Sequence, residues 1–94
     1  MKKEDILEYL KKNKSILQAK FQVKKIGLFG SFAKEKAHSK SDIDIIVDMP
    51  SNFDLYYDLK YYLEEAFKKE VDLGLEKNIR AYIKDKIKNE IIYV

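Results

Sequence analysis

The chain has 94 residues, a length that suits one compact domain and leaves no room for a second lobe. It carries 19 lysine and arginine residues against 16 aspartate and glutamate residues, which gives a formal net charge of +3. This excess is too small to indicate a nucleic-acid-binding surface, because such surfaces gather basic charge on one face. The 46% apolar content excludes intrinsic disorder. We therefore expect a single domain over residues 1–94.

The sequence shows no sign of an oxidising compartment or of a membrane. With no cysteine, a disulfide framework and a thiolate zinc site are both excluded. The longest apolar run, Ile43–Val47, is interrupted by Asp44, so no transmembrane span is predicted. The first five residues, MKKED, are charged and lack the apolar segment of a signal peptide. We expect a cytoplasmic protein.

The first two elements follow from apolar spacing. Between Lys3 and about Ala19, leucines and isoleucines recur at roughly helical spacing with lysines between them, which is typical of one amphipathic helix. Ile16 belongs to its apolar stripe. The segment Val23–Phe29 is short, apolar and β-branched, and it predicts the first strand. After Ser31 a polar segment follows, which we expect to begin with a helical turn.

The middle of the chain predicts a second strand and a long helix. Asp42–Asp48 alternates apolar and polar residues with period two, as a half-buried strand does. Ser51 has N-cap chemistry, with Asp54 three residues later in a position like that of a capping box. The helix that follows should end near Lys68 and bury the stripe Leu55, Leu59, Tyr62, Leu63 and Ala66.

The last third of the chain predicts one more strand and one more helix. Glu70–Leu75 alternates again, and isoleucines at four-residue spacing predict a helix from Ile79 to Ile91. The pattern therefore predicts an α/β (α+β) fold in which strands alternate with helices.

The chemistry of the sequence concentrates in Gly30-Ser31 and, after ten intervening residues, Asp42-Ile43-Asp44. Gly30 lets the backbone turn sharply against a ligand, and Ser31 offers a hydroxyl and an amide to phosphate oxygens. Asp42 and Asp44, two apart on a strand, project both carboxylates to one side of the sheet. Two like charges held this close repel unless a cation lies between them, and hard oxygen ligands suit magnesium or manganese. The pair predicts a metal site.

Asp72 is a third candidate carboxylate, on the polar side of an otherwise apolar strand. If the first two strands run antiparallel, so that the Gly-Ser turn meets Asp42, the third strand would place Asp72 beside the pair. Three carboxylates could hold two metal ions, one on nucleotide phosphates and one beside an attacking hydroxyl. Asp72 would be nearest the nucleophile, as metal ligand or proton acceptor.

The segments LFGSFAK (28–34) and SDIDIIV (41–47) resemble the signature of the minimal nucleotidyltransferases, a family of the DNA polymerase β-like superfamily. The resemblance covers nearly the whole chain, because EVDL (70–73) and the terminal amphipathic segment are similar to that family's third-carboxylate strand and closing helix. It implies a nucleotidyltransferase fold like the polymerase β palm, which is a small mixed β-sheet of three or more strands flanked by helices. It also implies nucleotide binding by Gly30, Ser31, Lys34 and Ser41, and metal binding and catalysis by Asp42, Asp44 and Asp72.

Many members of this family are antitoxins encoded beside a HEPN-domain toxin. The resemblance implies their activity here, the transfer of AMP from ATP to a toxin tyrosine with Mg²⁺ or Mn²⁺. The chain departs from the family at Lys34 and Glu35, where arginine and then glycine are common. Lysine keeps the charge but loses the bidentate fork of arginine, and glutamate removes a flexible position beside the phosphates.

Other functions stay open on the sequence. Aromatic residues cluster on the long helix: Phe53, Tyr56, Tyr57, Tyr61, Tyr62 and Phe67. Those that face outward could bind a partner, so a catalytically weak module could neutralise a toxin by stoichiometric complex formation. Transfer to RNA or to a small molecule is a third option, although we expect nucleic acid not to be a partner. A homo-oligomer is also left open.

Overall fold

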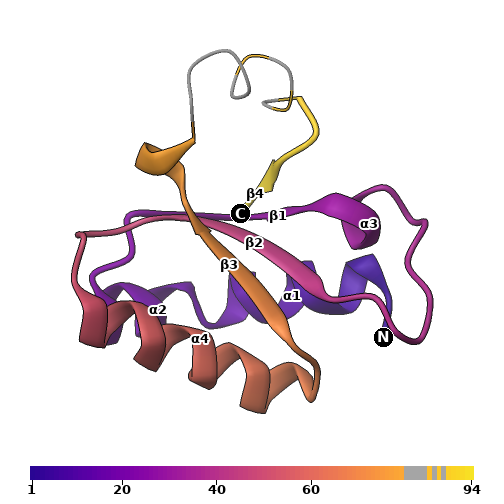
Figure 1. Cartoon of the computed structure of the whole chain (residues 1–94). Coiled ribbons are helices and arrows are strands. Elements are labelled where there is room, and N and C mark those ends of the chain that lie inside the picture. Colours follow the sequence, from indigo (N-terminus) through magenta and orange to yellow (C-terminus); the bar gives the residue numbers. More distant parts are fainter. Residues whose placement is uncertain (80–84, 86, 88) are drawn as a thin grey trace.

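The computed structural model describes residues 1–79, 85, 87 and 89–94. They form a four-stranded mixed sheet with helices packed against it, which confirms the predicted fold class (Figure 1). The first elements are α1 (Lys3–Lys12), α2 (Lys14–Phe21), β1 (Lys25–Phe29) and the short α3 (Gly30–Ala33). The others are β2 (Ile43–Asp48), α4 (Phe53–Phe67), β3 (Val71–Leu75), the 3₁₀ helix η1 (Glu76–Asn78) and β4 (Ile92–Tyr93).

The strand order is β3-β2-β1-β4. β1 runs antiparallel to β2 and to β4, whereas β2 and β3 are parallel. The antiparallel pairing of the first two strands and the place of the third beside the second are therefore as predicted. β4 was not predicted, because two residues carry too little pattern to indicate a strand. Gly27 of β1 allows β4 to approach closely, because a Cβ at this position would lie 3.1 Å from the carbonyl oxygen of Ile92.

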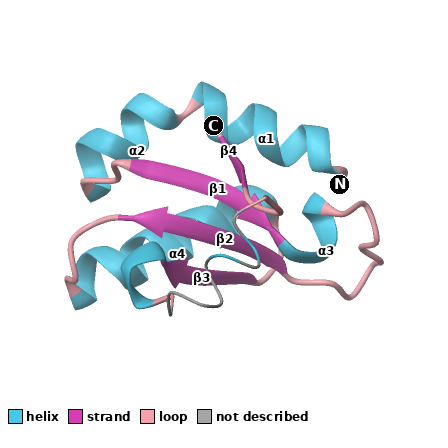
Figure 2. Cartoon of the chain, turned by 90° about the horizontal axis from the view of Figure 1, so that it is seen from above, coloured by secondary structure: helices cyan, strands magenta, loops and turns pink. Residues whose placement is uncertain are grey.

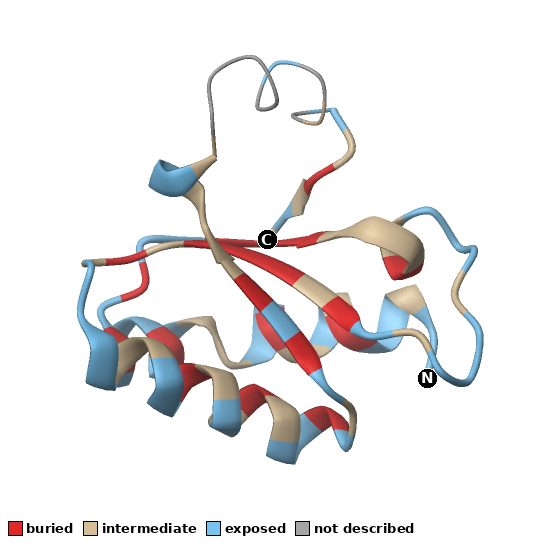
Figure 3. Cartoon of the chain, viewed as in Figure 1, coloured by how far each residue is buried: buried red, intermediate tan, exposed pale blue. Residues whose placement is uncertain are grey.

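Helices α1, α2 and α4 lie together on one side of the sheet (Figures 1 and 2). The hydrophobic core lies between them and the strands, where Figure 3 shows the buried segments of the ribbon. Ile43, Ile45 and Val47 belong to this core. Because side chains alternate along a strand, Asp44 projects from the opposite face of the sheet. We call this face, which also carries Asp72, the acidic face.

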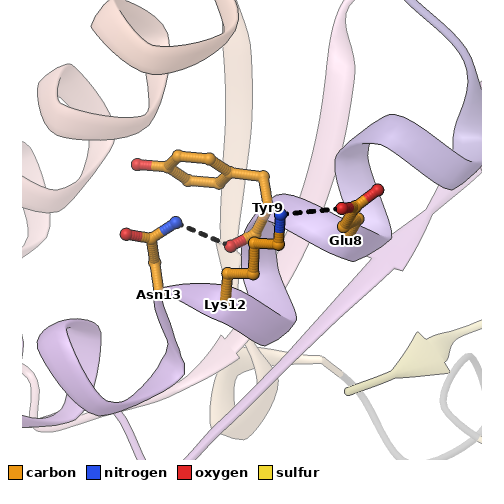
Figure 4. Close-up of polar contacts among 4 residues, drawn as sticks. All are labelled: Glu8, Tyr9, Lys12 and Asn13. Atoms are coloured by element: carbon orange, nitrogen blue, oxygen red, sulfur yellow. Dashed lines mark hydrogen bonds and ion pairs between the residues drawn. The ribbon is translucent and has the colours of Figure 1, made fainter.

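The N-terminal segment forms two helices rather than the single predicted one, with Asn13 between them. Asn13 Nδ2 donates a hydrogen bond to the Tyr9 carbonyl oxygen at 2.9 Å (Figure 4). This local bond competes with helix continuation, which is a known tendency of asparagine. The figure also shows the ion pair of Lys12 with Glu8, which does not cross the break. Ile16, expected in the apolar stripe, is exposed after the break.

Helix α4 begins one residue later than the capping pattern suggested. Asn52, and not Ser51, is the N-cap, and its Oδ1 accepts a hydrogen bond from the Leu55 amide at 3.0 Å. The helix ends at Phe67, where Lys68 takes a left-handed conformation with φ 55°. Its buried side chains are Leu59, Leu63 and Phe67, so Ala66, predicted in the stripe, is exposed instead.

The predicted C-terminal helix falls mostly on residues 80–84, 86 and 88, which lie outside the described residues. Ile79 and Ile91, its expected first and last residues, are not helical, so the prediction is wrong at both ends; Ile91 is buried directly before β4. Within the described part of the chain, no helix combines the length and the apolar character needed to cross a membrane.

The cap of α4 gives a test of the fold. Asn52→Ala should lower the free energy of unfolding by about 1 kcal/mol, because the Leu55 amide loses its acceptor. Urea denaturation followed by circular dichroism measures this loss. Ser51→Ala is the matched control and should change stability little; an equal loss in the two variants would contradict the assignment of the cap.

Candidate active site

The strand register brings two of the predicted carboxylates side by side. In the parallel pair of β2 and β3, Asp44 is the direct partner of Asp72. Asp44 is half-buried and Asp72 is exposed, and both belong to the acidic face. Asp42 precedes β2 by one residue and is also exposed. The three acids predicted from the sequence therefore gather at one end of the two strands.

The pKa of Asp44 shows that these carboxyl groups interact electrostatically. The pKa of Asp44 is raised above its ordinary value of 3.8, first because the group is partly buried. The charges of Asp72 and then of Asp42 raise the pKa further, and so does a hydrogen bond to the Asp72 carboxyl group. The folded chain thus holds negative charges close together at Asp44.

Gly30 lies at the same end of the sheet as Asp42, Asp44 and Asp72, which we call the acidic end. It follows β1 directly, and its neighbour Phe29 pairs with Asp44 across the antiparallel ladder. Gly30 has φ +76°, a conformation that favours glycine, and a Cβ there would lie 2.2 Å from Asp44 Oδ2. The Asp44 carboxylate therefore rests against the backbone of the Gly-Ser turn. The sequence predicted that this turn would meet Asp42, and the structure places Asp44, two residues further along, against it instead.

The two candidate serines differ in their surroundings. Ser31 is the second residue of α3 and is half-buried beside Gly30. Ser41 Oγ accepts a hydrogen bond from the His38 amide at 2.9 Å, and the Ser41 amide donates to the His38 carbonyl oxygen at 2.9 Å. Ser41 therefore closes the loop that leads into Asp42, whereas Ser31 lies next to the glycine that contacts Asp44.

Lys34 and Glu35 lie at the end of α3. Lys34 Nζ is 3.4 Å from Glu90 Oε1, an ion pair that no sequence pattern indicates. Glu35 has φ 58°, in the left-handed region that favours glycine. The backbone thus needs at this position the conformation that glycine adopts most readily, and Glu35 occupies it nonetheless.

The donor set of the acidic end fits a magnesium or manganese nucleotide complex. Among the described residues, no three acidic or histidine side chains converge into a ready-made metal cage. Mg²⁺, however, is usually held by one or two carboxylates together with substrate phosphates and water. Asp42, Asp44 and Asp72 offer hard oxygen ligands, and their mutual repulsion is the condition that a bound cation relieves.

An open cleft of about 830 Å³ adjoins the acids, between β3 and one side of α4. Asp42 and Asp72 form part of its lining, and α4 contributes side chains four residues apart: Tyr56, Lys60 and Glu64, followed by Lys68 just after the helix. This cleft was not predicted from the sequence. The spacing of these side chains could have indicated it, because residues at i and i+4 share one side of a helix.

A mixed sheet that holds the Asp44 carboxylate against a glycine-serine turn, with Asp42 and Asp72 nearby, suits the binding of a metal–nucleotide complex. The chain belongs to the nucleotidyltransferase domain family, whose model matches residues 10–94. This confirms the resemblance and the predicted enzyme class.

Two relatives match along nearly their whole length. A Methanocaldococcus jannaschii protein, MJ1379, whose name places it among the protein adenylyltransferases, is 42% identical over 95 residues, covering 96% of this chain and 95% of the relative. The protein adenylyltransferase MntA of Thermococcus cleftensis is 33% identical over 93 residues, covering 97% and 94% of the two chains.

Solved structures share the fold. One described as a minimal nucleotidyltransferase superposes with a TM-score of 0.82 at 24% identity, covering 98% of this chain and 95% of that one. A toxin–antitoxin structure with AMP-PNP superposes with a TM-score of 0.68 at 23% identity, covering 99% and 72% of the two chains. At this identity the likeness shows the fold alone.

The raised pKa of Asp44 gives a test of the site. The folded state keeps the Asp44 proton to higher pH than the unfolded state does, so stability falls as pH rises from about 3.8 through the raised folded pKa. Asp44→Asn removes this loss and should raise the melting temperature of the metal-free protein at pH 7. The gain should fade toward pH 3, where the carboxyl group is protonated in both states.

Calorimetric melting of metal-free protein across this pH range measures the effect. Asp58→Asn, on an exposed part of α4, is the control for losing a carboxylate elsewhere. A metal-free Asp44→Asn variant that melts below the wild-type protein at pH 7 would contradict the repulsion inferred here.

Proposed function

We propose that the chain is a magnesium-dependent protein adenylyltransferase that transfers AMP from ATP to a tyrosine of a HEPN-domain toxin and so acts as its antitoxin. Family membership and the names of both relatives support the class of reaction. The observation that carries the proposal is the pairing of Asp44 with Asp72 on the acidic face, directly against Gly30. The fold shared with a toxin–antitoxin structure supports the kind of partner.

In the proposed reaction the turn after β1 binds the triphosphate. Gly30 has no side chain to obstruct the phosphates, and Ser31 offers its hydroxyl and amide beside it. Asp42, Asp44 and Asp72 would hold the metal ion. When bound, Mg²⁺ supplies positive charge that screens the phosphates and the three carboxylates from one another.

The acceptor arrives on the side of Asp72, away from Gly30. Its tyrosine oxygen forms a bond to the α-phosphorus of ATP while the bond from that phosphorus to the bridging oxygen breaks, and pyrophosphate leaves in line. Asp72, which is exposed and lines the open cleft, accepts the tyrosine proton. Most of the rate enhancement comes from positioning the two reactants.

A row of exposed aromatic side chains supports a protein as the acceptor. On α4, Phe53 is 76% exposed, Tyr61 60% and Tyr57 36%. The ring centroids of Phe53 and Tyr57 are 4.7 Å apart, so the rings form one patch. Aromatic residues in a patch are typical of the centre of a protein interface. The same patch favours the second candidate function, a module that neutralises its toxin by binding alone.

Transfer is tested with a HEPN-domain toxin as the acceptor, ATP labelled at the α-phosphate, and Mg²⁺. The label should appear on a tyrosine of the partner, and the double variant Asp42→Ala, Asp44→Ala should lower the rate at least about 100-fold, because the phosphate charge is no longer compensated. The control removes two exposed carboxylates from α1, with Glu4→Ala and Glu8→Ala, and should keep the wild-type rate.

The outcomes separate the candidates. Labelling that survives the double variant would contradict the mechanism. Full neutralisation of the toxin by a double variant that transfers nothing would favour the binding module. Label found on RNA or on a small molecule, and not on the partner, would favour the third option.

A further inference from the structure

Within the described part of the chain, the strand that carries Asp72 has one edge without a strand beside it. β3 is the first of the described strands in the order β3-β2-β1-β4, so only one of its sides pairs with another of them. The Ile43 amide donates to the Glu70 carbonyl oxygen at 3.0 Å. This bond fixes which residues of β3 direct their backbone N–H and C=O groups toward β2 and which direct them away. With this register, Asp72 directs its backbone groups toward β2, and Val71 and Leu73 direct theirs to the free edge.

Two side chains of α4 bind this free edge. Glu64 Oε2 accepts a hydrogen bond from the Val71 amide at 3.0 Å, and the Tyr56 hydroxyl donates to the Leu73 carbonyl oxygen at 2.5 Å. One bond lies immediately before Asp72 in the sequence and the other immediately after it. The backbone around Asp72 is therefore held by β2 on one side and by α4 on the other.

Asp72 needs such support more than other residues of the strand. It is exposed, and its charge repels Asp44, its direct neighbour on β2. Repulsion between the two carboxylates favours separation of β3 from β2, and an edge strand has no second neighbour to resist it. The bonds from Glu64 and Tyr56 supply that resistance within reach of the charge.

The packing of α4 does not depend on these two side chains. Leu59 and Leu63, on another side of the helix, are fully buried in the core between α4 and the sheet. Tyr56 and Glu64 are only half-buried and line the cleft beside Asp72. Removing their polar groups should therefore leave the helix in place while releasing the edge of β3.

We propose that Tyr56 and Glu64 are positioning residues that hold Asp72 beside Asp44, so that the acidic end can bind a divalent cation and the acceptor hydroxyl. The statement about the acceptor hydroxyl rests on the proposed function. The statement about the divalent cation does not depend on it. Because neither side chain is placed among the ligands, both act through the backbone of Val71 and Leu73.

The test compares four variants of the full chain. Tyr56→Phe and Glu64→Ala each remove one edge bond, whereas Glu64→Gln keeps an acceptor oxygen for the Val71 amide. Tyr93→Phe is the matched control, because it deletes a hydroxyl that donates to Glu76 Oε2 at 2.7 Å, beyond the opposite end of β3. Titration with Mn²⁺ alone, followed by electron paramagnetic resonance of the free ion, measures cation affinity without any reaction.

Tyr56→Phe and Glu64→Ala should each weaken Mn²⁺ binding about tenfold, the scale typical of residues that support metal ligands. Glu64→Gln and Tyr93→Phe should keep the wild-type affinity. In the transfer assay the first two variants should need about tenfold more Mg²⁺ for half-maximal rate. A purely structural role would lower the melting temperature alike in Tyr56→Phe and Tyr93→Phe and leave both Mn²⁺ affinities unchanged.

Wild-type Mn²⁺ affinity in Tyr56→Phe and Glu64→Ala would overturn the inference, and so would a wild-type protein that binds no Mn²⁺. An equal loss of affinity in Tyr93→Phe would also overturn it. If the Mn²⁺ pattern is as expected but the wild-type protein transfers no AMP, the proposed function fails and the positioning of Asp72 stands.

Discussion

The site depends on two carboxylates that repel each other, those of Asp44 and Asp72. The parallel pairing of β2 with β3 holds these two residues side by side. The sheet can hold them because the other face of the same strands is buried: Ile43, Ile45 and Leu73 pack into the core under the helices. A slip of one residue would turn apolar side chains out and carboxylates into the core, so burial fixes the register. Hydrophobic packing thus supplies the force that keeps like charges together.

Helix α4 connects the core, the site and the surface. Leu59 and Leu63 pack into the core, while Tyr56 and Glu64 bind the free edge of β3. The aromatic patch that includes Phe53 is exposed to solvent. In the function proposed here, one helix thereby links partner binding to the placement of the third carboxylate.

Much of this architecture follows from the sequence, because alternation in 42–48 and 70–75 marks strands and places the acids on one face. The break at Asn13 did not, because it comes from a side-chain bond to Tyr9 that leaves the apolar spacing unchanged. The ion pair of Lys34 with Glu90 and the bond of Tyr56 to Leu73 join residues far apart in sequence, and the bond of Glu64 to the Val71 amide crosses the turn after α4, so only the tertiary structure reveals them. Glu35 departs from the family pattern, but its left-handed φ is visible only in the fold.

The most direct test of the central claim is a crystal structure with Mn²⁺ and a non-hydrolysable ATP analogue, in which anomalous scattering locates the metal. A manganese peak is expected within about 2.2 Å of carboxylate oxygens of Asp42, Asp44 and Asp72, beside the Gly30 turn. A peak among Glu64, Glu65 and Glu70, elsewhere in the lining of the cleft, with none at Asp44, would contradict the claim.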